Sequence, residues 1–233
     1  AFALNVAANV AKSTGKTVCI FSLEMSAEQL VNRMMASEAM VDSRKLRTGE
    51  ISGDEWTRLA DAATALSQTS ILIDDSTDVN PTQMKAKLRR VKDLGLIVID
   101  YLGLMQSGMK TESRVQEVSA ITRNLKVMAK SLGVPVLCCA QLSRGTEGRT
   151  DKRPQLSDLR ESGSIEQDAD MVLFLYRSDY YDNDSKESQG SGPNTADIMI
   201  AKNRHGAVAT VKMAWLAQYT KFISLSTDEP PAV

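Results

Sequence analysis

The 233-residue chain has little of what several common protein classes require. It has one histidine, and its three cysteines form no Cys-x-x-Cys pair, which excludes the usual zinc sites. Three cysteines are too few for a disulfide framework and favour a reducing cytoplasm. The best candidate for a membrane helix, residues 94–105, is interrupted by Asp100 and falls short of the ~20 apolar residues needed. We therefore expect a cytoplasmic protein without a membrane segment.

A surplus of charge of either sign is also missing. The chain has 28 Lys and Arg against 29 Asp and Glu, so a generally basic surface is excluded and any contact with nucleic acid must be local. Residues 1–10 lack a basic start and a cleavage site, so no secretory signal is expected. An apolar content of 42% is ordinary globular composition, and the length suffices for one domain with a real core.

What the chain does have is an alternation of helical and strand patterns. Apolar residues at helical spacing predict a helix over 1–14. Capping signals predict further helix starts at Ser26, Ser52, Asn80 (before Pro81), Ser113 and Ser164. The helix that follows Pro81 is expected to end at Gly95. Short apolar strands are expected between the helices, at 17–23, 71–74, 96–101, 134–141 and 171–176.

Continuous apolar strands that alternate with helices indicate a parallel sheet with both faces covered. After the polar loop 182–195 the pattern changes to close-set strands at 198–201, 208–215 and 219–225, which predict an antiparallel extension. The last residues, 227–233, read as a loose tail. The expected architecture is one α/β domain.

Polar side chains follow three of the predicted strands. Glu24 follows the first, Asp100 ends the third, and Gln141 ends the fourth. Ligands of open parallel sheets bind at the carboxyl ends of the strands, so the three side chains are expected to share one edge. Four apolar residues before Asp100 have the form of a Walker B element, whose carboxylate can hold Mg²⁺ beside nucleotide phosphates. Asp74 and Asp75 end another strand and are interpreted as loop caps.

Each of these residues also has an ordinary structural interpretation. Glu24 could activate an attacking water, or it could simply be an acid near a helix amino end. Gln141 could sense a terminal phosphate or cap its strand. Gly15-Lys16-Thr17 resembles the end of a phosphate-binding loop, but position 10 is valine and the order is helix–loop–strand instead of strand–loop–helix. We interpret Gly15 as the cap of a helix.

Five segments together carry a resemblance to a known family: FSLEMS at 21–26, IVIDYL at 97–102, AQLSRG at 140–145, SDLRESGSIEQDAD at 157–170 and IAKNR at 200–204. In this order they resemble the bacterial replicative DNA helicases of the DnaB family, over nearly the whole chain. The resemblance implies a RecA-like core, a mainly parallel twisted sheet with an antiparallel extension. Residues 1–226 would be the motor domain. In that family a P-loop precedes the helix that begins here at Ala1, so we expect a chain that lacks the P-loop to be a poor ATPase by itself.

The resemblance also implies roles for single residues. Glu24 matches the catalytic glutamate, Asp100 the Walker B aspartate that binds Mg²⁺ and ATP, and Gln141 the residue that couples the γ-phosphate to the DNA loops. Lys202 and Arg204 match a basic pair that reaches the nucleotide of a neighbouring subunit. From the sequence alone, the pair could equally be a solvated strand end.

Contact with DNA is expected in the basic stretch 144–160. The resemblance places Arg160, Glu161 and Gly163 on a single-strand backbone, and Arg144 lies in the same stretch. Only 5% of the residues are aromatic, and none lies between Trp56 and Tyr101 or between Tyr101 and Phe174, so backbone tracking fits better than base stacking. A second basic run, at 85–92, is interpreted as the solvated face of a helix.

The resemblance implies an ATP-driven motor that translocates 5′→3′ on single-stranded DNA as a homo-hexamer, with primase and a helicase loader as partners. One alternative is a RecA-type recombinase, which shares the core but forms open filaments. For the chain by itself, a non-catalytic DNA-binding or assembly module is a further alternative.

Overall fold

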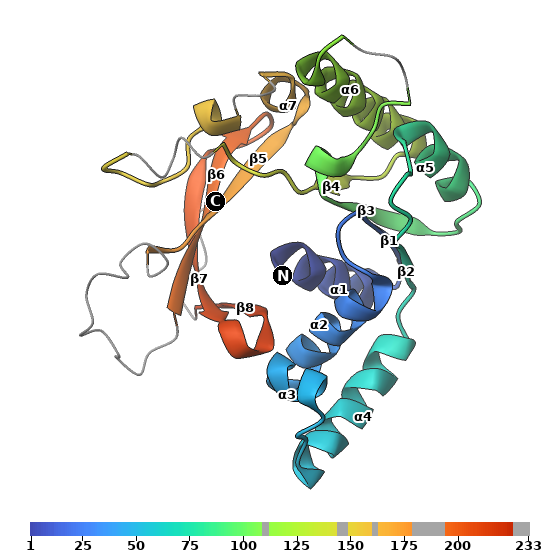
Figure 1. The fold of residues 1–233 in the computed structure, drawn as a ribbon, viewed down its shortest axis with the longest axis vertical. Coiled ribbons are helices and arrows are strands. Elements are labelled where there is room, and N and C mark those ends of the chain that lie inside the picture. Colours follow the sequence, from blue (N-terminus) through green and yellow to red (C-terminus); the bar gives the residue numbers. More distant parts are fainter. Residues whose placement is uncertain (109–111, 144–148, 160–162, 179–193, 226–233) are drawn as a thin grey trace.

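The computed structural model describes the chain except residues 109–111, 144–148, 160–162, 179–193 and 226–233. One of its two sheets is parallel, in the order β2-β1-β3-β4 (Figure 1). The strands are β1 (Thr17–Ser22), β2 (Ile71–Asp74), β3 (Leu94–Asp100) and β4 (Val136–Cys138). Thus β3 lies between β1 and β4, and the carboxyl ends of all three meet at one edge.

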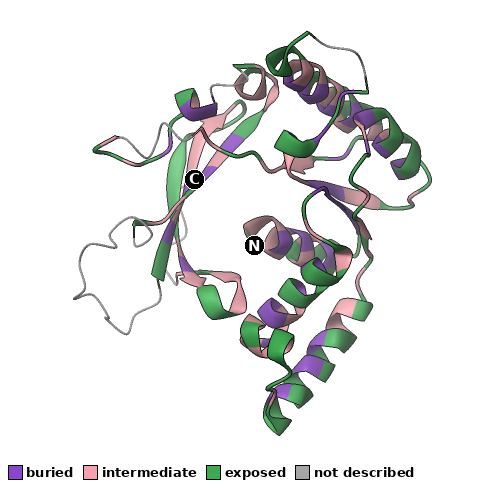
Figure 2. Ribbon diagram, viewed as in Figure 1, coloured by how far each residue is buried: buried purple, intermediate pink, exposed green. Residues whose placement is uncertain are grey.

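Helices cover both faces of this sheet, as predicted. The helices of the described chain are α1 (Phe2–Thr14), α2 (Ala27–Ala39), α3 (Ser43–Thr48), α4 (Gly53–Ser67), α5 (Pro81–Leu88), α6 (Arg114–Leu132) and α7 (Gly163–Asp168). Of these, α1 and α2 cover one face of the sheet, and α5 and α6 cover the other. Successive side chains of a strand point to opposite faces. In β1, Val18 and Ile20 pack with α1 and α2, whereas Cys19 and Phe21 pack with α5 and α6. The sheet therefore has two apolar layers, and its central strands are buried (Figure 2).

Most of the predicted helix starts are confirmed at the atomic level. The side chains of Ser26, Ser52 and Asn80 each accept a hydrogen bond from a backbone N–H in the first turn of their helix and complete capping boxes. Ser113 caps α6 in the same way through Gln116 N–H. Gly15 ends α1 in the left-handed region with φ 67°, so the GKT sequence is a helix end followed by a strand.

The second sheet is antiparallel, in the order β5-β6-β7-β8. It consists of β5 (Met171–Tyr176), β6 (Asn194–Asn203), β7 (Ala209–Leu216) and β8 (Lys221–Ser224). The prediction that residues 171–176 form a fifth strand of the parallel sheet is wrong. In the described part of the chain β5 pairs only with β6, and a largely apolar cavity of about 710 Å³ lies between the edges of β4 and β5.

Other features also differ from the prediction. The helix that begins at Pro81 ends at Leu88, and Gly95 lies within β3, where a side chain would collide with Lys16. Strand β4 covers only three residues of the expected 134–141. The short helix α3 was not predicted, and Ser164 does not cap α7, because its hydroxyl is buried without a partner inside that helix.

The two sheets are joined at the amino end of α1. Asn5 accepts a hydrogen bond from Phe222 N–H at 2.8 Å, and Phe2 packs edge-on against the Phe222 ring with centroids 5.4 Å apart. None of the helices in the described ranges combines the length and apolarity needed to cross a bilayer.

Candidate functional site

The carboxyl edge of the parallel sheet brings together the three side chains predicted to share it. Asp100 is opposite Ser22 in the pairing of β1 with β3, and Leu23 N–H donates to Asp100 C=O at 2.7 Å. Glu24 therefore lies one residue beyond this contact. On the other side, Cys139 N–H donates to Ile99 C=O at 2.8 Å, two residues before Gln141. The shared location is confirmed, whereas the roles of the three residues stay predictions.

All three side chains are available for a ligand. Asp100 is half-buried, and Glu24 and Gln141 are exposed. In the described ranges, none of these three side chains forms a hydrogen bond or ion pair. Asp74 and Asp75 differ: Asp74 pairs with Lys87 at 2.6 Å, and Asp75 accepts from Ala27 N–H at the start of α2 at 2.9 Å. Asp74 also accepts from Ser76 N–H at 3.1 Å, which confirms its interpretation as a loop cap, whereas Asp75 caps the amino end of α2.

The amino end of α1 faces the same edge. Ala1 lies within electrostatic reach of Asp100, Cys139 and Arg33. Helix amino ends carry partial positive charge and unpaired N–H groups, which favour phosphate. Burial, and then the charge of Asp100, raises the pKa of Cys139 to about 11. The thiol is therefore protonated at neutral pH and supplies no charge to the site.

The site fits a magnesium ion held by one protein carboxylate. No group of three or more His, Cys, Asp or Glu that could hold a metal is present in the described part. Mg²⁺ usually keeps several waters and binds through one or two carboxylates plus substrate phosphates. Asp100, with its free carboxylate at a rigid strand end, meets this need, since phosphates and water would complete the coordination.

Lys202 and Arg204 lie elsewhere. Lys202 Nζ donates to Glu166 C=O at 2.5 Å, and Arg204 pairs with Asp170 at 3.2 Å. The backbone N–H of Arg204 also donates to Asp170 C=O at 2.8 Å. Arg204 is therefore held beside the amino end of β5, which begins at Met171. The two cations are therefore together, but away from the edge that carries Asp100.

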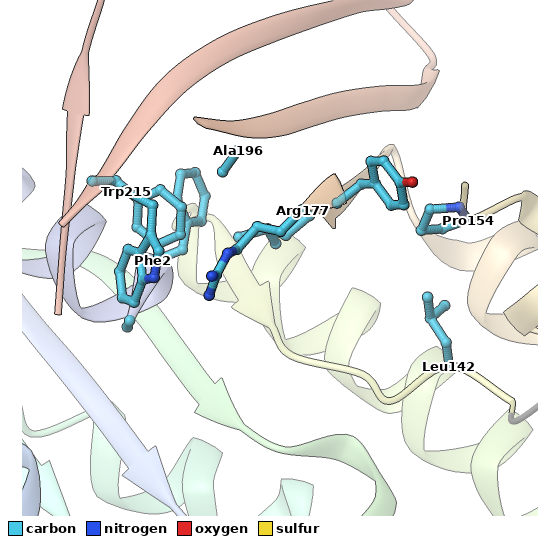
Figure 3. Close-up of a pocket in the computed structure, with 10 residues that line it drawn as sticks. Phe2, Leu142, Pro154, Arg177, Ala196 and Trp215 are labelled. Atoms are coloured by element: carbon cyan, nitrogen blue, oxygen red, sulfur yellow. The ribbon is translucent and has the colours of Figure 1, made fainter. Parts of the chain in front are cut away.

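The opposite, carboxyl end of β5 lies near the amino end of α1. A pocket of about 370 Å³ there is lined by Ala1, Phe2, Leu142, Leu175, Tyr176 and Trp215, among others (Figure 3). Figure 3 shows Phe2 beside Trp215, with Arg177 extending toward them, and the guanidinium of Arg177 lies 5.8 Å from the Trp215 ring centroid. This aromatic cluster connects the second sheet with the site edge.

Of the four predicted DNA residues, only Gly163 lies in the described part of the chain. Arg144, Arg160 and Glu161 lie outside the described residues, and Gly163 is the exposed first residue of α7. Of the basic stretch, Arg149 pairs with buried Asp158 at 2.6 Å, and Arg153 pairs with Asp197 at 3.3 Å. Arg149 therefore ties the stretch to itself, and Arg153 holds it against β6 of the second sheet.

Arg114 is a candidate that the sequence analysis missed. It is the first residue of α6, and it donates to the carbonyls of Gly103 and Met105, three and five residues after Asp100. The available signal was a cation at the first position of a helix, where the helix dipole disfavours it, followed three residues later by Glu117.

Comparison with known proteins agrees with this geometry. The model of the DnaB-like helicase C terminal domain family matches residues 1–224. The replicative DNA helicase DnaB of Geobacillus stearothermophilus is 52% identical over 229 residues, which cover 97% of this chain and 49% of the relative. The replicative DNA helicase DnaC of Bacillus subtilis (strain 168) has the same identity and coverage. The chain thus spans about half the length of these relatives.

Two solved structures are similar in fold. One is a DnaB-like replicative helicase described with its interactions with primase, with a TM-score of 0.89, 36% identity, and coverage of 97% of this chain and 54% of that chain. The other is an ATPase domain, with the same TM-score and identity, covering 97% of this chain and 80% of that chain. The chain belongs to the DnaB-like helicase C-terminal domain family.

Proposed function

We propose that this domain is the ATP-hydrolysing motor of a replicative DNA helicase that translocates 5′→3′ on single-stranded DNA as a homo-hexamer in the cytoplasm. One observation carries the proposal: Glu24, Asp100 and Gln141 stand unpaired in the described chain at one sheet edge, in a member of the DnaB-like family. The direction of movement and the hexamer rest on the family resemblance.

ATP with Mg²⁺ is the proposed substrate pair. Bound Mg²⁺ would neutralise the phosphate oxygens, and Asp100 would hold it from the end of β3. Glu24 would orient the attacking water and take its proton, because an exposed carboxylate at this edge can reach solvent and phosphate together. Gln141 would sense the terminal phosphate by hydrogen bonding and pass its state to the stretch that follows β4.

Arg204, with Lys202, would serve the site of a neighbouring subunit. Arg204 lies in space beside the amino end of β5, where it pairs with Asp170. The carboxyl end of β5 lies beside the amino end of α1. The six residues of β5 separate these ends, about 20 Å at roughly 3.3 Å per residue. Arg204 is therefore remote from the Asp100 edge of its own chain, which supports action across a subunit boundary. An arginine there would neutralise charge that develops on the phosphoryl group.

The DNA contact is proposed for the segment around α7. Arg160, Glu161 and Gly163 would bind the single-strand backbone, together with Arg144. Lys202 and Arg204 both bond backbone carbonyls of α7, the helix that begins at Gly163. A shift of α7 driven by the nucleotide of the neighbouring subunit would therefore move the DNA contact. Primase and a helicase loader are the proposed protein partners, and one similar structure is described with primase.

The proposal is tested in the complete protein by replacing Glu24 with glutamine. The amide keeps the shape but cannot accept a proton, so DNA-stimulated ATP turnover should fall roughly 10²- to 10⁴-fold while binding of a fluorescent ATP analogue persists. The matched control is Glu28→Gln, the same change at an exposed acid on α2, which should leave turnover unchanged. A parent protein that neither hydrolyses ATP nor unwinds a forked duplex would refute the proposed function.

A further inference from the structure

The carboxylate of Asp100 depends on its backbone for its position. No described side chain forms a hydrogen bond with this carboxylate. Its orientation is therefore set by the end of β3 and by the turn that follows, Leu102–Leu104. Leu102 N–H donates to Cys139 C=O at 2.9 Å, which ties one side of this turn to the end of β4. Gly103 lies against the Tyr101 ring so closely that a β-carbon would be 2.5 Å from it.

Arg114 fixes the other side of the turn. Its Nη2 donates to Gly103 C=O at 2.7 Å and its Nη1 to Met105 C=O at 3.0 Å. Glu117 accepts from Arg114 Nη1 at 2.6 Å and from Ser107 N–H at 3.2 Å. The Arg114 guanidinium thus binds two carbonyls within five residues of Asp100, and the Glu117 carboxylate binds both this guanidinium and the backbone N–H of Ser107.

This arrangement is not explained by the stability of α6. A cation at the first helical position opposes the helix dipole, and Ser113 already caps the helix. Where a residue breaks a local preference, the reason is commonly found at a functional site. Here the unfavourable position of Arg114 at the start of α6 places its guanidinium donors against the backbone carbonyls of Gly103 and Met105.

We propose that Arg114 is a positioning residue. By hydrogen bonding to the Gly103 and Met105 carbonyls, it holds the Asp100 carboxylate in the orientation that binds the magnesium ion. This inference rests on the proposed function. Arg114 itself touches neither nucleotide nor metal. The ion pair with Glu117 keeps the Arg114 guanidinium in place against the two carbonyls.

The test is the Mg²⁺ dependence of Arg114→Gln in the complete protein. The glutamine cannot reach both carbonyls, so the Mg²⁺ concentration for half-maximal ATP turnover should rise roughly 3- to 10-fold, below the roughly 10–100-fold typical of groups that contact a metal ligand directly. Binding of the fluorescent ATP analogue without Mg²⁺ should match the parent. Arg114→Lys, which can bond one carbonyl at a time, should lie between the two.

Hydrogen exchange supplies a readout independent of activity. The amides of 102–107 should exchange faster in Arg114→Gln, while those of β3 stay protected. Arg123→Gln, an exposed arginine on the same helix, is the matched control and should change neither quantity. If Arg114→Gln does not fold, Glu117→Gln replaces it in the same measurements. Its Mg²⁺ concentration for half-maximal ATP turnover should rise less than expected for Arg114→Gln, but should still exceed that of the parent.

The outcomes separate the two proposals. A parent without Mg²⁺-dependent ATP turnover refutes the proposed function. A working parent with an unchanged Mg²⁺ requirement in both Arg114→Gln and Glu117→Gln, or a loss of turnover equal at all Mg²⁺ concentrations, overturns the positioning role alone.

Discussion

At the scale of single residues, Asp100 and Glu24 occupy the same edge in different surroundings. Asp100 is half-buried at the end of β3, while Glu24 is exposed one residue beyond the contact between β1 and Asp100. A half-buried carboxylate at a rigid strand end suits a metal, whereas an exposed one can exchange protons with water. This difference in burial is the basis for dividing their roles.

We expect Asp100→Asn to weaken Mg²⁺-dependent nucleotide binding at least about tenfold, because the amide removes the negative charge that holds the ion. Binding without Mg²⁺ should change little. Nucleotide titrations with and without Mg²⁺ check this in the complete protein, beside Glu24→Gln. If the two variants had the same binding and turnover, the division of roles would be wrong.

At the scale of elements, capping could be predicted well from the sequence because it depends on residues three positions apart. Ser26, Ser52 and Asn80 form the expected boxes. The end of α5 was predicted wrongly because Gly95 was interpreted as a helix terminator. Its small size is instead needed where β3 passes the Lys16 side chain, a contact between residues far apart in the sequence that no local pattern contains.

The same distinction holds at the site. Glu24, Asp100 and Gln141 could be placed together because parallel strands end at a common edge. Arg114 could not, because its partners are backbone carbonyls, which every residue has. The break between β4 and β5 was missed for a related reason: apolar runs predict strands but not their neighbours.

A pH dependence of stability is expected for α4. The hydrogen bond from Lys45, and then the one from Ser52 N–H, lower the pKa of Glu55 to about 2. The folded state therefore holds this proton less tightly than the unfolded chain. The stabilisation is complete above the unfolded pKa of 4.5 and is lost as the pH falls from 4.5 toward 2.

Urea unfolding between pH 7 and pH 3 measures this effect. Glu55→Gln should be less stable than the parent at pH 7, and the difference should shrink as the pH falls. Glu50→Gln, an exposed acid before the same helix, serves as the control and should follow the parent. An equal difference between parent and Glu55→Gln at all pH values would contradict the assignment.

At the scale of the whole molecule, the position of Arg204 predicts that a working site combines two subunits. In the complete protein, Arg204→Ala should lower ATP turnover by roughly 10³-fold, because the lost charge acts mainly in the transition state. Nucleotide binding to its own subunit should remain.

Mixing inactive proteins gives the decisive measurement. When Arg204→Ala and Glu24→Gln subunits exchange, some interfaces join an intact Glu24 to a neighbour's intact Arg204, and part of the ATP hydrolysis should return. Hydrolysis is scored before unwinding, so that the result does not depend on how many adjacent sites unwinding needs. With exchange confirmed separately, no recovery would assign Arg204 to its own subunit or to structure alone.

The cavity between β4 and β5 has a consequence for how the polypeptide behaves at high concentration. In the described ranges, each of these strands has one edge with no ladder partner, and the Leu175 side chain is 45% exposed. Open strand edges template the addition of further extended chains. We expect the 233-residue chain by itself to assemble into β-rich aggregates that bind thioflavin T, and Leu175→Lys to slow their growth. Val31→Lys, at an equally exposed apolar position on helix α2, should slow it less, so that colloidal stability depends on the strand edge more than on apolar surface in general.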